Sequence, residues 1–401
     1  MAESRPVAAG ASAGCARAFD SASGCATIVP PIFERDARVT AEALGSATAI
    51  GSGEAAPRLA DQAAAGEGFA PSSPRIASRR IAPHCAALDL GTNNCRLLIA
   101  RPSGQAFRVI DAFSRIVRLG EGLGTTGALS EAAMARTLDA LKVCADKIAH
   151  RKAASGRYVA TEACRRAANC AEFLARVREA TGIALEIISA AEEARLVVTG
   201  CAPLLNPRIP YAIVFDIGGG STEIVWLHRG VGNGLARHRP EILGSVSLPF
   251  GVVTLTERFG GIEVSPAIYR AMVAEAEAAL APFEREHRIL REVRAGRAQM
   301  LGSSGTVTTL AGVHLALPRY IRAMVDGSIL TFEQIAIVSR HLAGLDLAGR
   351  AASPCVGRER ADLVLSGCAI LDAICATWPV GRLRVADRGI REGILFDLMQ
   401  R

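Results

Sequence analysis

The feature of the sequence that most constrains the fold is a repeated pattern of strand, polar turn and strand. The runs CAALDLG and NCRLLIARP are short and apolar, and a turn of Gly, Thr and Asn residues joins them. The stretch AIVFDIGGGSTEIVWL repeats this pattern in the second half of the chain. Short apolar runs bounded by turn residues are typical of buried strands. The repeat therefore predicts two sheets that begin in the same way.

Strands and helices alternate on both sides of a proline-bounded break at 206–210. The first half reads β-β-β-α-β-α-β-α, and Ser130 is the predicted N-cap of its first helix. At 401 residues the chain exceeds the roughly 250–300 at which single cores stop growing. We expect an α/β protein with domains at 84–206 and 207–389. The later predicted helices are 251–259, 265–286, 306–317, 331–345, 358–378 and 390–400, and the C-terminal helix, 390–401, is expected to join the first domain.

The first 83 residues differ from the rest, being rich in Ala, Gly, Ser and Pro without periodicity, and we expect a disordered extension. They lack the continuous apolar core of about 7–15 residues of a secretory signal. No apolar run reaches the ~18 residues of a membrane span. Eleven cysteines without metal or disulfide spacing fit reduced thiols, so we expect a cytoplasmic protein.

The net charge is +7, but the arginines are dispersed along the sequence and aromatic residues make up only 4%. A nucleic-acid surface usually needs a contiguous basic patch with interleaved aromatics, so nucleic acid is disfavoured as the primary ligand. A scattered basic surplus can still raise the local concentration of a polyanionic substrate.

Two turns carry the strongest chemical signal. The first runs from Asp89 to Arg96 (DLGTNNCR) and offers a carboxylate, a glycine and small polar side chains. Such residues can hold Mg²⁺ and admit phosphate oxygens, although an ordinary Asn-rich hairpin is the alternative. The second runs from Asp216 to Glu223 (DIGGGSTE), and its three glycines weaken a strand unless a ligand approaches the backbone. The two turns are predicted to grip one phosphate chain.

A third turn, Gly302 to Thr306 (GSSGT), follows a strand and opens a helix. Free N–H groups and the positive helix end favour an anion there. A plain strand-to-helix turn explains the same residues.

These three turns resemble the phosphate 1, phosphate 2 and adenosine loops of the actin, sugar kinase and heat-shock ATPase superfamily. The closer resemblance is to the exopolyphosphatase and guanosine pentaphosphate phosphatase family, over about residues 85–401. It rests on eight blocks in family order: ALDLGTNNCRLLIA, VRLGEGL, ATEACRRAANCAEF, IISAAEEARL, VFDIGGGSTEIV, SLPFGVVTL, LGSSGTVTTLAG and VADRGIREGIL. The resemblance implies two actin-like (ribonuclease H-like) domains with the active site in the cleft between them.

The family resemblance also implies a reaction and its residues. Water attacks a terminal phosphoryl group, a glutamate activates the water, and Mg²⁺ is the expected cofactor. Glu162 matches that glutamate, with Arg165 behind it, although a carboxylate favoured by the helix dipole is the alternative. Glu193 is the second catalytic candidate, because only one of Glu192 and Glu193 can face the cleft. The metal candidates are Asp89, Asp216 and Glu223, and the phosphate-binding candidates are Gly91, Thr92, Asn93, Asn94, Arg96, Arg118, Gly218, Gly219, Gly220, Ser221, Thr222, Gly302, Ser304, Gly305 and Thr306.

Three positions depart from the family pattern: Thr92 and Asn94 stand where the first loop usually has serines, and Arg388 where a tryptophan is usual. We expect altered phosphate affinity rather than lost function. Inorganic polyphosphate and guanosine pentaphosphate remain the two expected substrates, and a homodimer is an open expectation. A kinase or ATPase of the same superfamily is one alternative. A sensor that binds polyphosphate or a phosphorylated alarmone without turnover is another.

Overall fold

The computed structural model describes residues 83–104, 106–229, 240–261 and 263–400. The extension predicted for residues 1–83 lies outside the described residues except for its last position. The described residues form one compact unit by their contacts, and all elements below belong to it.

The first sheet contains five strands in the order β3-β2-β1-β4-β5. β1, β2 and β3 are antiparallel neighbours, and β4 and β5 run parallel to β1. β1 and the middle of β2 (residues 97–100) are mostly apolar because both of their faces are buried. Its strands are β1 His84–Leu90, β2 Asn94–Ser103, β3 Ala106–Ile116, β4 Ala153–Ala160 and β5 Glu186–Ile187, and its helices are α1 Leu123–Thr126, α2 Glu131–His150, α3 Glu162–Arg166 and α4 Cys170–Thr181.

The second sheet contains six strands in the order β10-β11-β9-β6-β7-β8. Its first three strands along the chain are again antiparallel, and β9 and β11 are added in parallel. Apart from the edge strand β10, it repeats the first sheet, as the sequence repeat predicted. Its strands are β6 Tyr211–Ile217, β7 Thr222–His228, β8 Glu241–Leu248, β9 Ala298–Ser304, β10 Ile329–Thr331 and β11 Arg382–Ala386.

One large core joins the second sheet to its helices, with Trp378, Phe215 and Phe250 among its largest fully buried side chains. The amphipathic pattern predicted most of these helices to within a few residues. They are α6 Val252–Arg258, α7 Pro266–His287, α8 Ile289–Arg294, α9 Gly305–His314, α10 Arg322–Val325, α11 Phe332–Ala343, α12 Leu347–Ala352 and α13 Val364–Thr377.

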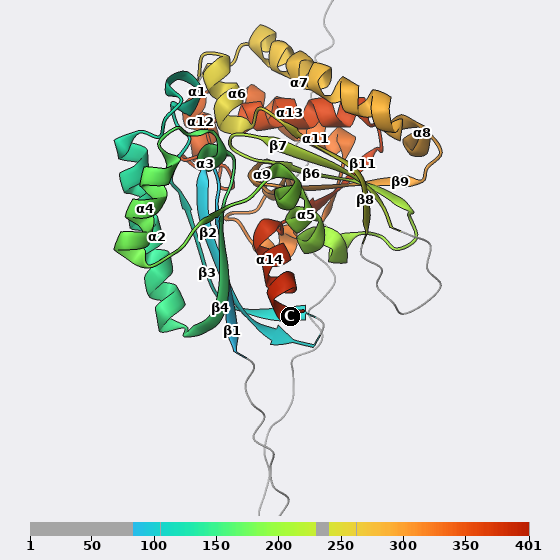
Figure 1. The fold of residues 1–401 in the computed structure, drawn as a ribbon. Helices are drawn as coiled ribbons and strands as arrows, with labels where there is room; N and C mark the ends of the chain where they lie inside the picture. Colours follow the sequence, from blue (N-terminus) through green and yellow to red (C-terminus); the bar gives the residue numbers. More distant parts are fainter. Residues whose placement is uncertain (1–82, 105, 230–239, 262, 401) are drawn as a thin grey trace, which may run out of the picture. The chain divides into compact units, whose positions relative to one another are not determined.

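Two helices lie between the sheets: α5 (Ala190–Cys201), which a 3₁₀ turn at Ala202–Leu204 extends, and α14 (Ile390–Met399). Figure 1 shows them side by side, and their apolar residues share one core with residues of β1, β2, β6 and β7. The C-terminal helix α14 packs against α5 and against β1 of the first sheet. The predicted domain division at 206 and 389 remains a prediction.

The helix predicted over 358–378 is shorter than expected. α13 begins only at Val364, and residues 358–363 form turns. Gly357, at φ +71°, redirects the backbone just before this segment. The side chains of Arg360 and Asp362 bond to residues outside the segment. The correction matters because these turns border the cleft described below.

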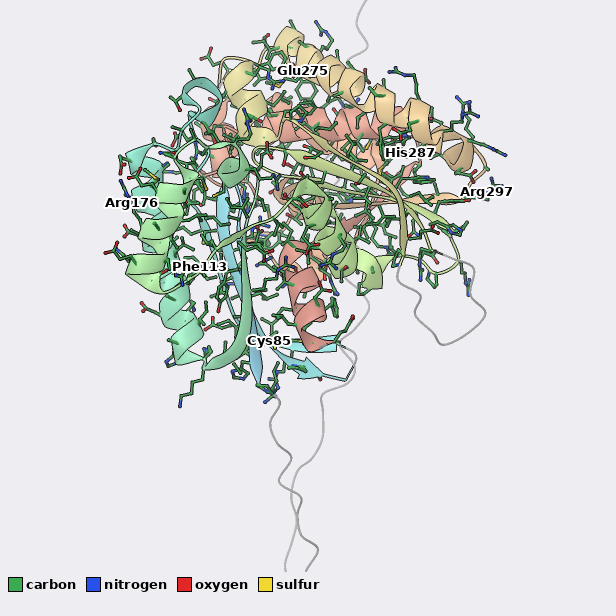
Figure 2. All side chains as sticks on the ribbon, in the orientation of Figure 1. Cys85, Phe113, Arg176, Glu275, His287 and Arg297 are labelled. Atoms are coloured by element: carbon green, nitrogen blue, oxygen red, sulfur yellow. The ribbon has the colours of Figure 1, made fainter. Side chains whose placement is uncertain are left out.

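Figure 2 shows the side chains: Arg176 and Phe113 lie over the part built on the first sheet, and Glu275, His287 and Arg297 over the part with α7 and α8. The nine cysteines of the described residues are free thiols. Within the described ranges, no helix is both long enough and apolar enough to cross a bilayer.

Candidate active site

A cleft with a cavity volume of about 110 Å³ lies where the turns after β1, β6 and β9 meet. Sequence patterns alone pointed to most of its lining. The predicted residues that line it are Asp89, Gly91, Thr92, Asn93, Asn94, Arg96, Glu162, Glu193, Asp216, Gly218, Gly219, Gly220, Ser221, Ser304, Gly305 and Thr306.

The triple glycine of the second turn lets the first two turns touch. A Cβ added at Gly219 would lie 3.0 Å from the Cβ of Asn93, and one at Gly220 would lie 2.6 Å from Oγ1 of Thr92. Any side chain at Gly219 or Gly220 would push the two turns apart. The close approach requires glycine here; none of these residues has a positive φ.

The first turn holds three buried polar atoms that lack a hydrogen-bond partner among the described residues: Oγ1 of Thr92, Oδ1 of Asn93 and Oδ1 of Asn94. A buried polar group without a partner costs about 1–3 kcal/mol, so such groups usually meet a ligand or water. In the second turn, the N–H groups of Gly219 and Gly220 bond to no other backbone group of the described chain. Both turns therefore present unused polar groups to the cleft.

The third turn places the N-terminus of α9 at the cleft. Ser304 is its N-cap, and its hydroxyl accepts a bond from the N–H of Val307 (3.0 Å). The N–H groups of Gly305 and Thr306, at the first positions of the helix, have no partner within it. This end carries a partial positive charge that favours an anion.

Two arginines converge on the same point from opposite sides. A Cβ added at Gly305 would lie 3.9 Å from Cζ of Arg360 and 4.0 Å from Nη2 of Arg96. The side chain of Arg96 forms no hydrogen bond or ion pair with another described residue, and the side chain of Arg360 bonds only to Oγ1 of Thr309 (3.1 Å). Burial and the neighbouring Arg96 lower the pKa of Arg360. Two guanidinium groups beside one helix N-terminus form a site for a phosphate group, and Arg96 also acts electrostatically on Asp89 and Asp216.

Arg165 holds both catalytic candidates. It donates to Oε2 of Glu162 from Nε (3.0 Å) and Nη2 (2.8 Å), and to Oε2 of Glu193 from Nη1 (2.7 Å). Oε1 of Glu162 lies 4.0 Å from Nε of Arg166, so it is open to accept a bond from water. Glu193 is buried in the cleft wall, whereas Glu192 pairs with Arg195 and Arg157. The structure thus selects Glu193 over Glu192 as the cleft residue.

Asp89 and Asp216 occupy equivalent positions on β1 and β6. No described residue donates a hydrogen bond to either carboxylate. Burial raises the pKa of Asp89, and burial, Glu223 and Asp89 raise the pKa of Asp216 to about 8. Burying an ionised carboxylate without a partner costs free energy, and a bound cation would offset that cost.

The donor set suits Mg²⁺ bound together with phosphate. The two carboxylates and the unpartnered oxygens of the first turn are hard oxygen ligands. Nowhere in the described ranges do three His, Cys, Asp or Glu side chains form a metal-binding group of their own. Mg²⁺ commonly binds through one or two carboxylates and completes its shell with water and substrate phosphates. The residues present fit that mode.

Four predicted residues lie outside the cleft lining. The guanidinium of Arg118 pairs with Asp362, the hydroxyl of Thr222 donates to the carbonyl of Phe250 (2.9 Å), and Gly302 packs against the ring of Phe215. Oε1 of Glu223 accepts bonds from Ser221 (2.8 Å) and Ser247 (2.9 Å), so Glu223 supports the second turn from behind. Each of these groups is already used by the fold.

Arg360 is the one charged residue of the described cleft lining that sequence reasoning missed. It falls in the stretch 358–378, whose apolar character suggested one continuous helix, and the charged run Arg358-Glu359-Arg360 at the start of such a helix looks solvent-exposed. Gly357 was the available signal, because a glycine can end a helix and reset the chain direction.

The repeated sheets, the central helices and a cleft lined by glycine turns place the chain in the actin-like ATPase superfamily. Its family follows from residues 98–401, which match the sequence model of the Ppx/GppA phosphatase family. The match covers more than half of the chain, so the chain belongs to this family.

Three relatives illustrate the similarity. Guanosine-5'-triphosphate,3'-diphosphate pyrophosphatase of Aeromonas hydrophila is 33% identical over 318 residues, 79% of this chain and 60% of that protein. Exopolyphosphatase 2 of Mycobacterium tuberculosis is 32% identical over 327 residues, 78% of this chain and 98% of that protein. The crystal structure of the Aquifex aeolicus Ppx/GppA family member matches with a TM-score of 0.63 at 29% identity, covering 79% of this chain and 98% of that one. The chain thus spans 60% of the length of the Aeromonas relative.

Proposed function

We propose that this protein hydrolyses the terminal phosphoanhydride bond of a linear polyphosphate or of guanosine pentaphosphate. The observation that carries the proposal is the convergence of Arg96, Arg360 and the N-terminus of α9 opposite Glu162 in one cleft. Both substrates present a chain of phosphates to such a cleft. The names of the relatives, a pentaphosphate pyrophosphatase and an exopolyphosphatase, support the same pair.

In the proposed reaction, the glycine turns and the two arginines hold the phosphate chain and neutralise its charge. A water next to Oε1 of Glu162 attacks the terminal phosphorus and passes a proton to that carboxylate. The bond from phosphorus to the bridging oxygen breaks, and this oxygen keeps the electron pair. Phosphoryl transfer has a loose transition state, so positioning and charge neutralisation provide most of the rate. Arg165 orients Glu162 for this role.

Mg²⁺ would be held by Asp89 and Asp216 together with substrate oxygens, and it would stabilise the negative charge that builds up on them. The buried carboxylates without hydrogen-bond donors support this assignment.

Phosphate release from long-chain polyphosphate, guanosine pentaphosphate and ATP, measured in parallel with and without Mg²⁺, tests the proposal. We expect Mg²⁺-dependent release from one or both of the first two. The lack of a recognisable guanine-reading motif in the sequence favours polyphosphate. Consumption of ATP only with an acceptor would instead indicate a kinase. Tight binding of polyphosphate or guanosine pentaphosphate without release would indicate a sensor.

Replacing Asp216 with asparagine is expected to raise the Mg²⁺ concentration for half-maximal activity about tenfold, since a neutral amide binds the cation less strongly. The rise in melting temperature on adding Mg²⁺ should shrink as well. Asp372→Asn is the matched control, because burial also raises the pKa of Asp372, but this residue accepts a bond from Tyr269 of α7 and does not line the cleft. An unchanged Mg²⁺ titration of Asp216→Asn would remove Asp216 from the metal site.

A further inference from the structure

Arg118, which follows β3, forms hydrogen bonds with the turn segment 358–363, which borders the cleft. Its Nη1 donates to Oδ2 of Asp362 (2.8 Å), and its Nη2 donates to Oδ1 of Asp362 (3.0 Å) and to the carbonyl of Glu359 (3.2 Å). The pair is two-pronged, and the side chains are only 31% and 18% exposed. A bidentate, partly buried pair of this kind is stronger and more directional than an ordinary surface ion pair.

The backbone of Arg118 is fixed on the phosphate-binding side. The N–H groups of Val117 and Arg118 both donate to the carbonyl of Asn93 in the first turn, at 2.8 and 3.1 Å. Arg118 has φ +48°, a left-handed conformation that is unfavourable for any residue but glycine. Arg118 thus forms a direct link from the first turn to the segment 358–363.

The segment carries Arg360, which faces Arg96 across the cleft. The two guanidinium groups repel each other, and burial together with this repulsion lowers the pKa of Arg360. Asp89 and Asp216 near Arg96, and Asp387 and Glu359 near Arg360, offset only part of the repulsion, because none of these carboxylates bonds to either guanidinium. The Arg118–Asp362 pair opposes this repulsion, because it holds the segment 358–363 close to the first turn. A second bond crosses the cleft edge beside it, from the N–H of Gly122 to Oε1 of Glu257 (2.9 Å).

We propose that Arg118 is a positioning residue: by holding Asp362 and Glu359 it sets Arg360 against Arg96, so that a phosphate chain closes the cleft by neutralising that pair. Arg118 then acts on the ligand only through Arg360. The inference rests on the proposed function for the nature of the anion. It also gives Arg118 a role other than the direct phosphate contact expected from the sequence.

A double-mutant cycle tests the link. The variants are Arg118→Gln, Arg360→Gln and the two combined, and the probe is inorganic tripolyphosphate without Mg²⁺, measured by calorimetry. We expect each single change to weaken binding about tenfold and the double variant to bind within twofold of Arg360→Gln. For Arg118→Gln, the steady-state KM should rise in step with the dissociation constant, by a larger factor than kcat falls. Independent effects that multiply to about a hundredfold would overturn the proposal.

Two further measurements keep the test decisive if Arg118→Gln also loosens the fold. The double variant Arg118→Asp with Asp362→Arg exchanges the two charges. It should bind tripolyphosphate more tightly than Arg118→Asp alone, and equally weak binding would overturn the role proposed for the Arg118–Asp362 pair. Amide hydrogen exchange of residues 358–363 should speed up in Arg118→Gln but not in Arg176→Gln, whose arginine pairs with Glu131 on the exterior. Equal exchange in both variants would overturn the proposal. Neither the binding comparison nor the hydrogen exchange needs turnover. A wild-type protein that releases no phosphate would therefore refute the proposed function, but the positioning role of Arg118 could still be tested.

Discussion

The variant Glu162→Gln is expected to release phosphate about two to four orders of magnitude more slowly than the wild type, while KM changes less than about threefold. The amide has nearly the same size and can still accept the bonds of Arg165, but it cannot take a proton from water. The binding groups of the turns and of α9 stay in place, so substrate affinity should persist. The measurement is steady-state phosphate release from the preferred substrate, with tripolyphosphate binding measured alongside.

Glu192→Gln is the matched control. Glu192 also stands in the first turn of a helix and also pairs with arginines, but it lies outside the cleft lining. It should keep turnover within about threefold of the wild type, since only its ion pairs with Arg157 and Arg195 weaken. If Glu162→Gln kept near-normal turnover, or if both variants lost it equally, Glu162 would not be the group that activates water.

The sequence predicted those parts of the cleft whose signal is local. The turns that follow β1 and β6 combine an aspartate, glycines and small polar residues within eight positions, and these residues are adjacent in the chain before they are adjacent in space. The repeated strand pattern likewise predicted both sheets, because buried strands need apolar runs whatever their partners are. Both patterns depend only on residues close together in the sequence, so they can be recognised without knowing the fold.

Signals that depend on distant partners were missed or misread. Arg118 precedes a glycine-rich turn and suggested a phosphate contact, but its partner Asp362 lies 244 positions away, and no local pattern records that pairing. Gly302 looked like part of a phosphate-binding turn, yet β9 continues to Ser304 and Gly302 makes room for the ring of Phe215. The choice between Glu192 and Glu193 needed the rotation of α5 about its axis, which the packing of α5 against α14 sets.

The crossing of α5 and α14 leads to the second large expected effect. Gly393→Ala is expected to lower the stability of the folded protein by about 2–3 kcal/mol, because the added methyl group would lie 2.1 Å from the carbonyl oxygen of Leu196. Its neighbours there are backbone atoms, which no side-chain rotation can move aside. On the other side of the crossing, a Cβ at Gly200 would lie 2.2 Å from the carbonyl oxygen of Gly389. The two helices can therefore relieve the clash only by moving apart.

The separation should also reach the cleft, since α5 carries Glu193 and the first residue of α14, Ile390, lines it. We expect a fall in melting temperature on the order of 5–10 °C, together with a lower kcat at temperatures where the variant is still folded. Gly344→Ala is the control, because φ is −77° there and the nearest atoms to its added Cβ lie at an ordinary 3.5 Å. A melting temperature of Gly393→Ala within 1 °C of that control would show that the helices tolerate a wider spacing, and the backbone contact would then not be what fixes Glu193 in the cleft.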